Sequence, residues 1–411
     1  MAHPGRISGK ALEYLKEVVD YGFGNSSGAG LTGRFERAFS QRIGVNYTIA
    51  HCNGTATLHS CLAAAGVKPG DEVITTPLTA AAPAYSILHH GAIPVFADVD
   101  ERTFNIDPKS IRERITPLTK AIMPVHLYGL PADMDPIMEI AKEHNLIVIE
   151  DSAECYLSMY KGKLVGTIGH MASFSLQASK HLTCGDGGMV TTNSEQYATA
   201  VRKFSCFGYH SLTSKSGGVI PKKERGDPDS IRHDSMGWNY RMSELQGAVA
   251  LEQVERIDEL VEKRMKIGKL FRDGVSGCSW LIPQFVPAGS TNSYWTFVCR
   301  FESEEAGCSW KEFREKFYSF GGDFFYGAWQ LSYNEPIFQQ RNFLGGFFPI
   351  DSSIYKGDFR QYKPGLCPVA EKLQSKLMQF KTNYEDLEEA KKQVEALRKT
   401  IEFFNNNNKN N

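Results

Sequence analysis

A single lysine lies in a chemically suggestive place in the stretch FSLQASKHLTCGDGG, residues 174–188. Lys180 follows an apolar run that has the character of a strand and precedes a cluster of glycines, and Ser175 lies five residues before it. A lysine amine can attack a carbonyl group and can act as a general base, whereas a lysine on a surface loop is only a solvated charge. The choice between these interpretations depends on other residues.

Two further segments carry groups that complement such a lysine. Asp151 directly follows the apolar run LIVIE, and in parallel sheets ligands bind outside the carboxyl ends of the strands. Asn53, Gly54 and Thr55 begin a helix-length segment, where free backbone N–H groups and a hydroxyl can bind a phosphate. Each has an ordinary alternative, because an aspartate can cap a turn and Asn-Gly-Thr is also a good helix cap.

Together these groups match what pyridoxal 5'-phosphate requires. The lysine would form a Schiff base with the cofactor, the carboxylate would keep its ring nitrogen protonated, and the helix N-terminus would bind its phosphate. We therefore predict a site for this cofactor, with Lys180 and Asp151 as the catalytic residues.

The order of the elements predicts an α/β fold. From about residue 52 to 193, short apolar runs alternate with helix-length segments, and several runs are apolar at consecutive positions, as in strands covered on both faces. We expect strands at 71–76, 93–99, 120–128, 146–151, 172–176 and 188–192, and helices at 55–65, 80–90, 108–115 and 135–144. This pattern predicts a mostly parallel central sheet flanked by helices.

The rest of the chain predicts a second, smaller domain. We expect a large domain at 1–255 with an extended loop at about 211–236, and a smaller C-terminal α+β domain at 256–404. A long helix at about 243–271 would join them, followed by a strand at 296–301 and a last helix at 385–404. Residues 405–411 are rich in asparagine, which predicts a disordered tail.

Composition narrows the class of function. Lys and Arg number 46 against 47 Asp and Glu, so the chain has no overall field that would attract nucleic acid or an anionic membrane. The nine cysteines are scattered without a CxxC pair, which argues against structural zinc and disulfides. The N-terminus lacks the apolar run of a signal peptide, and no apolar stretch would span a bilayer. We expect a cytoplasmic protein with small-molecule substrates and no metal.

The sequence resembles the DegT/DnrJ/EryC1/StrS family of sugar aminotransferases, which have the type I fold of pyridoxal-phosphate enzymes. The resemblance covers nearly the whole chain and rests on many blocks in order, among them LTGRFERAFSQRIGV, NGTATLHSCL, GAIPVFADVDERTFNIDP, VIEDSAE and GWNYRMSELQGAVALEQ. It implies a large domain with a mostly parallel sheet, a smaller C-terminal domain, and amine transfer from L-glutamate to a keto sugar. The product would be an amino sugar for surface polysaccharide or lipopolysaccharide.

The resemblance also implies roles for single residues. Lys180 matches the Schiff-base lysine and Asp151 the residue that pairs with the pyridinium nitrogen. Three residues match phosphate ligands: Gly54, Thr55 and Ser175. Asn239, in WNYRM, matches an asparagine that family members place in the phosphate site of the neighbouring subunit, which implies a homodimer with shared active sites.

Two residues depart from the family pattern. Ala80 stands where members usually have an aromatic residue that stacks on the cofactor ring, so the stacking group must be missing or come from elsewhere. Glu154 replaces the usual Gln or His three residues after the aspartate, and it would repel the cofactor's phenolate unless it is protonated or turns away. His126 ends another predicted strand, where a structural role is as plausible as a role in the site.

The acceptor is left open between several chemistries. The family resemblance favours a nucleotide-linked 4-keto-6-deoxyhexose as the acceptor. The long loop carries four cationic residues: Lys215, Lys222, Lys223 and Arg225. They could bind a diphosphate or a sugar carboxylate, or they could equally be a solvated surface. The long loop, together with segments 327–333 and 378–384, is also similar to members that aminate a keto form of 3-deoxy-octulosonic acid. A sugar dehydratase would carry histidine at Lys180, and a non-enzymatic sensor is supported only by Ala80.

Overall fold

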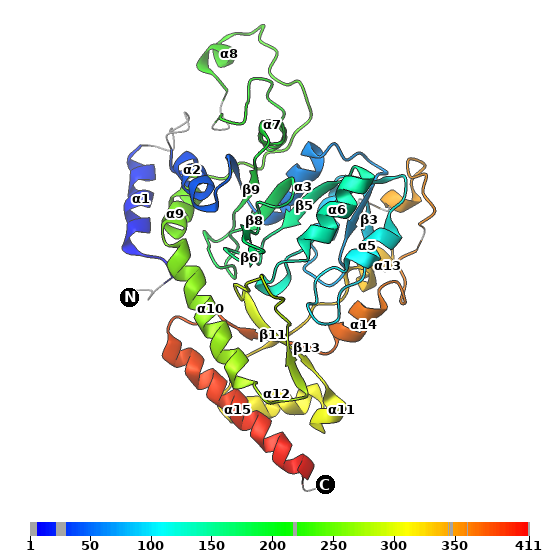
Figure 1. The fold of residues 1–411 in the computed structure, drawn as a ribbon. Coiled ribbons are helices and arrows are strands. Elements are labelled where there is room, and N and C mark those ends of the chain that lie inside the picture. Colours follow the sequence, from blue (N-terminus) through cyan, green and yellow to red (C-terminus); the bar gives the residue numbers. More distant parts are fainter. Residues whose placement is uncertain are drawn as a thin grey trace.

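The structure is a computed structural model that describes residues 6–21, 30–216, 220–343, 345, 348–359 and 361–409. Within these residues a seven-stranded central sheet lies above a four-stranded C-terminal sheet (Figure 1). A short hairpin of β6 (Met159–Tyr160) and β7 (Lys163–Leu164) is separate from both sheets. The site residues belong to the central sheet and to the segments that connect its strands.

The central sheet confirms the predicted α/β class. Its strands are β1 (Tyr47–His51), β2 (Glu72–Thr75), β3 (Ile93–Phe96), β4 (Thr119–Met123), β5 (Ile147–Asp151), β8 (Met171–Ser175) and β9 (Gly188–Thr192). They lie in the order β1-β9-β8-β5-β4-β2-β3, and pairing is parallel from β8 to β3. Only β9 runs antiparallel to its neighbours, β8 and β1. The six predicted strands are present, and β1 is an additional strand.

Helices cover this sheet on both faces. The helices of this part of the chain are α1 (Gly9–Asp20), α2 (Leu31–Ile43), α3 (Gly54–Ala64), α4 (Ala82–His89), α5 (Pro108–Arg114), α6 (Met134–His144), α7 (Glu195–Phe204), α8 (Lys222–Gly226) and α9 (Glu244–Glu255), of which α8 lies away from the sheet. Ile122 and Val148 pack in one core with α5 and α6, whereas their strand neighbours Ala121 and Ile149 pack in another core with α3 and α7. Because adjacent strand residues point to opposite faces, both cores demand apolar residues, which explains the uninterrupted apolar runs.

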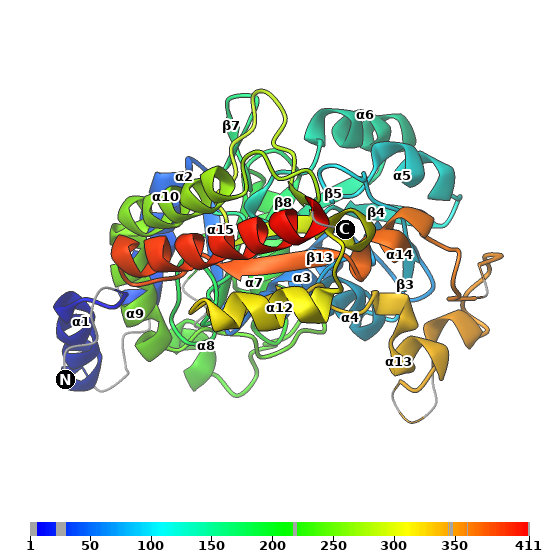
Figure 2. The same cartoon turned by 90° about the horizontal axis from the view of Figure 1, so that it is seen from below.

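The C-terminal sheet is antiparallel. It consists of β10 (Leu281–Pro283), β11 (Thr296–Phe301), β13 (Leu377–Lys381) and β12 (Tyr326–Gly327), in that order. Helices α10 (Ile257–Gly274), α12 (Trp310–Ser319) and α15 (Leu387–Lys409) pack with one face of this sheet (Figure 2). The shorter helices are α11 (Ser303–Ala306), α13 (Pro336–Gln339) and α14 (Pro368–Gln374), with single 3-10 turns at Leu127–Gly129, Ser332–Asn334 and Pro349–Asp351. The strand expected at 296–301 is β11.

The helix expected at about 243–271 is two helices. Helix α9 ends at Glu255 and α10 begins at Ile257, and Arg256 between them has φ −111° and ψ 13°, outside the helical range. Both helices bury an apolar side, so apolar residues continue at helical spacing through the break. Helix α9 packs on α2, whereas α10 packs on α15 and β11. A change of packing partner therefore interrupts a pattern that reads as one helix.

The C-terminal end also differs from expectation. Helix α15 continues to Lys409, so the asparagine-rich run is helical where disorder was predicted, while residues 410–411 lie outside the described part. Phe404 is buried, and the Trp280 indole N–H donates to the Asn405 side-chain oxygen at 2.8 Å. Extending a formed helix needs no new nucleation, so a polar sequence can continue it.

Part of the expected C-terminal domain packs with the large domain. Leu331, Tyr333, Phe338 and Tyr362 share a core with residues of β2, β3 and β4, and the Tyr362 hydroxyl donates to the Pro94 carbonyl at 2.9 Å. The segment between β12 and β13 thus covers the β3 edge of the central sheet. A boundary at residue 256 does not describe this segment.

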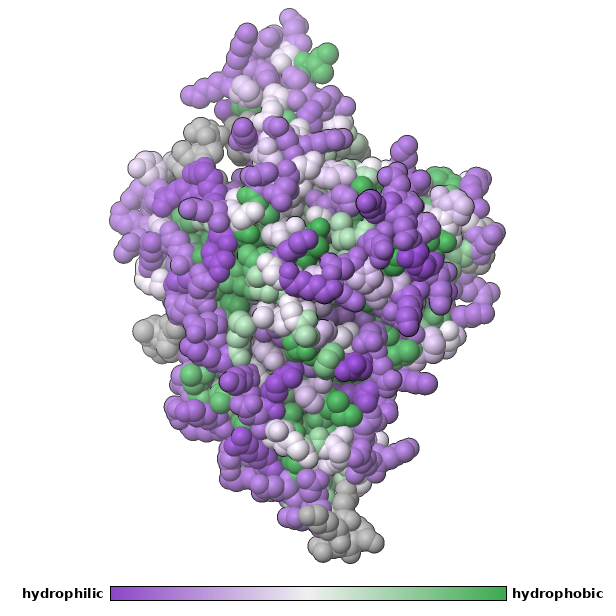
Figure 3. Space-filling view, viewed as in Figure 1, coloured by the Kyte–Doolittle hydropathy of each residue, from purple (hydrophilic) through white to green (hydrophobic). Residues whose placement is uncertain are grey.

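One face of the protein can be described by its polarity. On the face seen in Figure 3, hydrophilic residues predominate and apolar residues lie scattered among them. Among the described residues, every helix is too short or too polar to cross a bilayer.

Candidate active site

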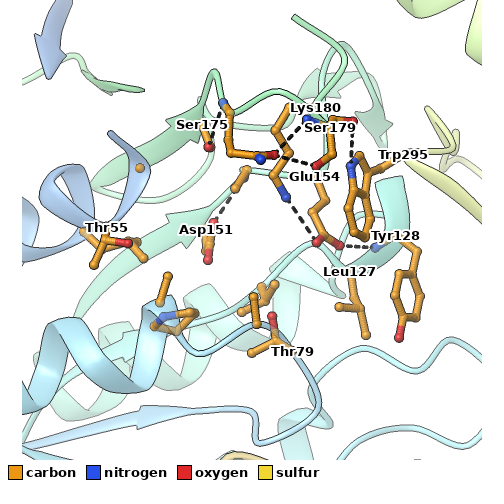
Figure 4. Close-up of a pocket in the computed structure, with 18 of the residues that line it drawn as sticks. Thr55, Thr79, Leu127, Tyr128, Asp151, Glu154, Ser175, Ser179, Lys180 and Trp295 are labelled. Atoms are coloured by element: carbon orange, nitrogen blue, oxygen red, sulfur yellow. Dashed lines mark hydrogen bonds and ion pairs between the residues drawn. The ribbon is translucent and has the colours of Figure 1, made fainter. Parts of the chain in front are cut away.

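A cavity of about 410 Å³ gathers most of the residues predicted from the sequence (Figure 4). Eight of them line it: Asn53, Gly54, Thr55, Ala80, Asp151, Glu154, Ser175 and Lys180. It opens beyond the carboxyl ends of the parallel strands, with Asp151 at the end of β5, Ser175 at the end of β8 and Ala80 after β2. This is the edge at which parallel sheets bind ligands.

Lys180 is enclosed in this cavity. Its side chain is 12% exposed, and its Nζ lies 3.3 Å from Glu154 Oε1 and 4.3 Å from the centre of the Trp295 ring. Its backbone N–H donates to the Gln177 carbonyl at 2.9 Å, which closes a turn after β8. The amine therefore points into a partly apolar space rather than into bulk water.

Side chains from distant segments hold the turn that carries Lys180. Arg264, on α10, donates to the carbonyls of Ser179, Lys180 and Trp295, each at 2.8 Å. The Trp295 indole N–H donates to the Ser179 carbonyl at 3.0 Å, and Arg6 also donates to the Lys180 carbonyl. Burial, followed by the charge of Arg6, lowers the pKa of Arg264, but a guanidinium stays charged at neutral pH.

Replacing Arg264 by methionine is expected to lower the free energy of unfolding by about 3 kcal/mol, because it removes three hydrogen bonds that a buried guanidinium donates. Urea unfolding of the purified variant measures the change. Arg272→Met is the matched control, since Arg272 lies on the same helix but binds Gln284 and Tyr294 instead. An Arg264→Met variant as stable as Arg272→Met would contradict this role.

Asp151 is a buried carboxyl group opposite the lysine. It is 4% exposed, and its Oδ1 accepts a hydrogen bond from the Ala153 N–H at 3.1 Å. Burial raises the pKa of Asp151 to about 6, although the hydrogen bond from Ala153 and the charge of Lys180 act against this shift. A cationic group placed against Asp151 would restore its ionised form.

His126 has a structural place rather than a place in the site. It is fully buried, its Nε2 lies 3.0 Å from Glu150 Oε2, and its Nδ1 accepts a hydrogen bond from the Ala132 N–H at 3.0 Å. Glu150 also accepts from the N–H groups of Gly166, Ile168 and Gly169. This buried network holds Glu150, the residue before Asp151, and so fixes the end of β5 that carries Asp151.

The N-terminus of α3 forms an anion cradle. Asn53 caps the helix, since its Oδ1 accepts from the Ala56 N–H at 2.9 Å, and the first N–H groups of the helix have no intrahelical acceptor. A Cβ at Gly54 would lie 2.9 Å from Ser175 Cβ, so only glycine lets α3 approach β8 this closely. The N–H groups of Gly54 and Thr55 and the hydroxyls of Thr55 and Ser175 fit a phosphate.

The two departures from the family pattern are visible in the cavity wall. Ala80 leaves its part of the wall without a ring, whereas the rings of Tyr128 and Trp295 are nearly parallel at 5° with centroids 6.5 Å apart. Glu154 does not turn away, because its Oε2 accepts from the Tyr128 N–H at 3.0 Å and its Oε1 faces Lys180. The carboxylate is therefore held at the amine.

Asn239 does not line the cavity of its own chain. It is exposed and pairs with Cys206 near the end of α7, at the base of the extended segment that carries α8 away from the body of the protein (Figure 1). The four cations of this segment, Lys215, Lys222, Lys223 and Arg225, are also exposed and lie outside the cavity.

The cavity wall also contains residues that the sequence analysis did not assign to the site, among them Tyr128, Trp295, Trp329 and Gln379. Tyr128 lies in the 3-10 turn after β4, where the rule on strand ends could have found it. Trp329 and Gln379 lie in segments 327–333 and 378–384, which the sequence analysis compared with other family members without assigning them to the site, and Trp295 has no local signal.

Comparison with known proteins assigns the chain to a protein family. The sequence model of the DegT/DnrJ/EryC1/StrS aminotransferase family matches residues 6–385. The chain belongs to this family. The predicted family, its fold class and its class of enzyme, an aminotransferase, are thereby confirmed.

Single relatives agree with this assignment. A GDP-perosamine synthase of Caulobacter vibrioides is 42% identical over 262 residues, which cover 64% of this chain and 66% of the relative. A GDP-perosamine synthase of Vibrio cholerae is 30% identical over 364 residues, covering 88% and 93%. Among solved structures, an aminotransferase from Psychrobacter cryohalolentis superposes with a TM-score of 0.83 at 29% identity, covering 98% of this chain and 99% of that one.

Proposed function

We propose that this family member uses pyridoxal 5'-phosphate to move an amino group from L-glutamate to a keto sugar in amino-sugar biosynthesis. The observation that carries the proposal is the meeting of Lys180, Asp151 and the anion cradle of α3 in one cavity. Relatives that are named GDP-perosamine synthases support an amino sugar as the product.

The described residues fit this cofactor. When bound, pyridoxal phosphate supplies a carbonyl carbon for the lysine and a ring that accepts electrons. Gly54, Thr55 and Ser175 bind its phosphate from the helix N-terminus and the end of β8. Asp151 pairs with the ring nitrogen, because a carboxyl group with a pKa of about 6 ionises readily beside a cation.

Lys180 and Glu154 form the proton-handling pair. With the cofactor bound, Lys180 Nζ would be the group that takes a proton from the substrate carbon and returns it. Glu154 Oε1 lies 3.3 Å from this amine and holds it in the cavity. The rings of Trp295 and Tyr128 exclude water from the same space.

The acceptor and the assembly follow from the same reasoning. We take the acceptor to be a nucleotide-linked keto sugar, because perosamine synthases of this family are named for a GDP-linked product. The exposed Asn239 is free to reach the phosphate site of a second subunit, which supports a homodimer with shared sites. The nine scattered cysteines, without a CxxC pair, favour a cytoplasmic enzyme.

Absorbance spectroscopy tests the proposal. The purified protein, loaded with pyridoxal phosphate, is expected to be yellow and to lose this absorbance when L-glutamate is added. A nucleotide-linked 4-keto-6-deoxyhexose should then restore the absorbance as its amino product forms, and a keto 3-deoxy-octulosonic acid serves as the competing acceptor. Protein that binds no cofactor, or whose spectrum does not respond to any amino acid, would overturn the proposal.

A further inference from the structure

An exposed row of aromatic side chains extends from the active-site cavity. Trp329, which lines the cavity, is 60% exposed, Tyr326 is 48% exposed and Phe324 is 46% exposed. We call these three residues the aromatic strip. Large aromatic side chains are usually buried, so three exposed ones within six residues indicate a surface that a ligand covers.

Strand pairing shows which way the strip faces. Tyr326 pairs with Gln379, so the two side chains lie on the same face of the sheet, and Gln379 lines the cavity. The Gln379 amide also donates to the Gly327 carbonyl at 2.8 Å, which fixes β12 against β13. Tyr326 is therefore the next side chain outward from the cavity wall.

The neighbouring residues confirm this direction. Phe325 is buried among the C-terminal helices, and a Cβ at Gly327 would lie 3.8 Å from the Trp310 ring of α12. Residues 325 and 327 thus face the helices, and Tyr326 faces away from them. The Phe324 and Tyr326 rings meet edge to face at 78° with centroids 4.8 Å apart, so Phe324 continues the same row.

Polar groups border the strip. Lys381 lies two residues after Gln379 on the same strand, and its Nζ is 2.8 Å from Asp323 Oδ2, directly before Phe324 in sequence. A ligand on the strip would therefore meet aromatic rings, with the ion pair of Lys381 and Asp323 beside Phe324. Flat aromatic surfaces with adjacent donors and acceptors bind nucleobases, whose rings stack and whose edges form hydrogen bonds.

We propose that the aromatic strip of Phe324, Tyr326 and Trp329 binds the base of a nucleoside diphosphate attached to the acceptor sugar. This inference rests on the proposed function, because it takes the keto sugar to lie in the cavity. Trp329 borders the cavity, and Tyr326 and Phe324 receive the base. The strip makes the enzyme selective for nucleotide-linked sugars over free sugars.

Calorimetric titration of the cofactor-loaded protein with GDP and with UDP tests the strip. Tyr326→Ala is expected to weaken nucleotide binding about 10-fold, whereas Tyr326→Phe, which keeps the ring, binds like the wild type. Phe320→Ala is the matched control, because Phe320 is an exposed aromatic residue of the same domain that packs on Phe403 of α15 instead.

Three results would overturn the inference: GDP and UDP both fail to bind the wild type, Tyr326→Ala binds them unchanged, or Tyr326→Ala alters the oligomeric state. The last result would show that a second protein subunit covers the strip. These failures differ from failure of the proposed function, because the wild-type spectrum would still respond to L-glutamate. Loss of that response as well would remove both proposals.

Discussion

A Lys180→Ala variant is expected to lose amine transfer by at least about 1,000-fold while retaining its fold. Lys180 lines the cavity together with Asp151 and Trp295, and in the proposed function it would supply both the covalent link to the cofactor and the base that moves the proton. Steady-state assays with L-glutamate and a nucleotide-linked keto sugar measure the loss. Addition of methylamine should recover part of the activity, since the space left by the side chain admits a small base.

Two controls separate chemistry from stability. Removing the Lys180 amine leaves Glu154, which is 8% exposed, with its Tyr128 contact but without a cation, and this lowers the free energy of unfolding. The double variant Lys180→Ala, Glu154→Gln should recover that stability and remain inactive. Lys161→Ala removes an exposed lysine paired with Asp135 and should change neither property. Transfer by Lys180→Ala near the wild-type rate would refute the assignment.

Replacing Asp151 by asparagine is expected to lower activity but to raise the stability of the cofactor-free protein. Asp151→Asn should lower amine transfer by about 100-fold or more, because an amide cannot hold a proton on the ring nitrogen. The same change should make the cofactor-free protein more stable at pH 8. Urea unfolding of the cofactor-free wild type and variant at pH 4 and pH 8 measures the second effect.

The sign follows from the raised pKa. The carboxyl group has a pKa of about 6 in the folded chain against 3.8 ordinarily, so the folded state holds this proton more tightly than the unfolded state. Stability from this group is therefore lost as pH rises from about 4 to 6, by about 3 kcal/mol in all. The amide introduced by Asp151→Asn does not titrate, so the variant avoids that loss. A variant less stable than the wild type at pH 8 would contradict this account.

Asp135 serves as a control because its pKa is shifted in the opposite direction to that of Asp151. Asp135 is exposed, and its bond to Lys161 lowers its pKa, so Asp135→Asn removes a group that stabilises the protein only when ionised. This variant should therefore not gain stability at pH 8. Because Asp135 is solvated, its effect should also be much smaller than that of Asp151.

The central sheet was predictable because its signal is local. Each parallel strand is covered on both faces, so runs such as IPVF and IVIED are apolar throughout and can be recognised without partners. Strand order and the antiparallel direction of β9 are set by pairing between distant segments, which apolar runs do not encode. The edge strand β1, YTIAH, was missed because it combines a tyrosine, a threonine and a histidine with only two aliphatic residues.

The site was predictable only on the side built by the central sheet. Asp151, Ser175 and Gly54 lie where strands end and a helix begins, which are positions that the sequence pattern marks. Trp295 and Gln379 reach the cavity because the C-terminal sheet packs against the large domain, and that contact joins residues more than 100 positions apart from Lys180 and Asp151. The helical asparagine run shows the same limit, since Trp280 and the preceding helix decide its structure.

The hydrogen bonds from Arg264 to the turn that carries Lys180 also connect the two sheets. One guanidinium joins α10, the entry to β11 and the turn after β8, and the His181 ring is also hydrogen-bonded to the Ser293 carbonyl at 2.9 Å. A hinge opening between the C-terminal sheet and the central sheet would have to break all these bonds beside the reactive amine. We therefore expect substrates to reach Lys180 through the open rim of the cavity, with the two sheets held together.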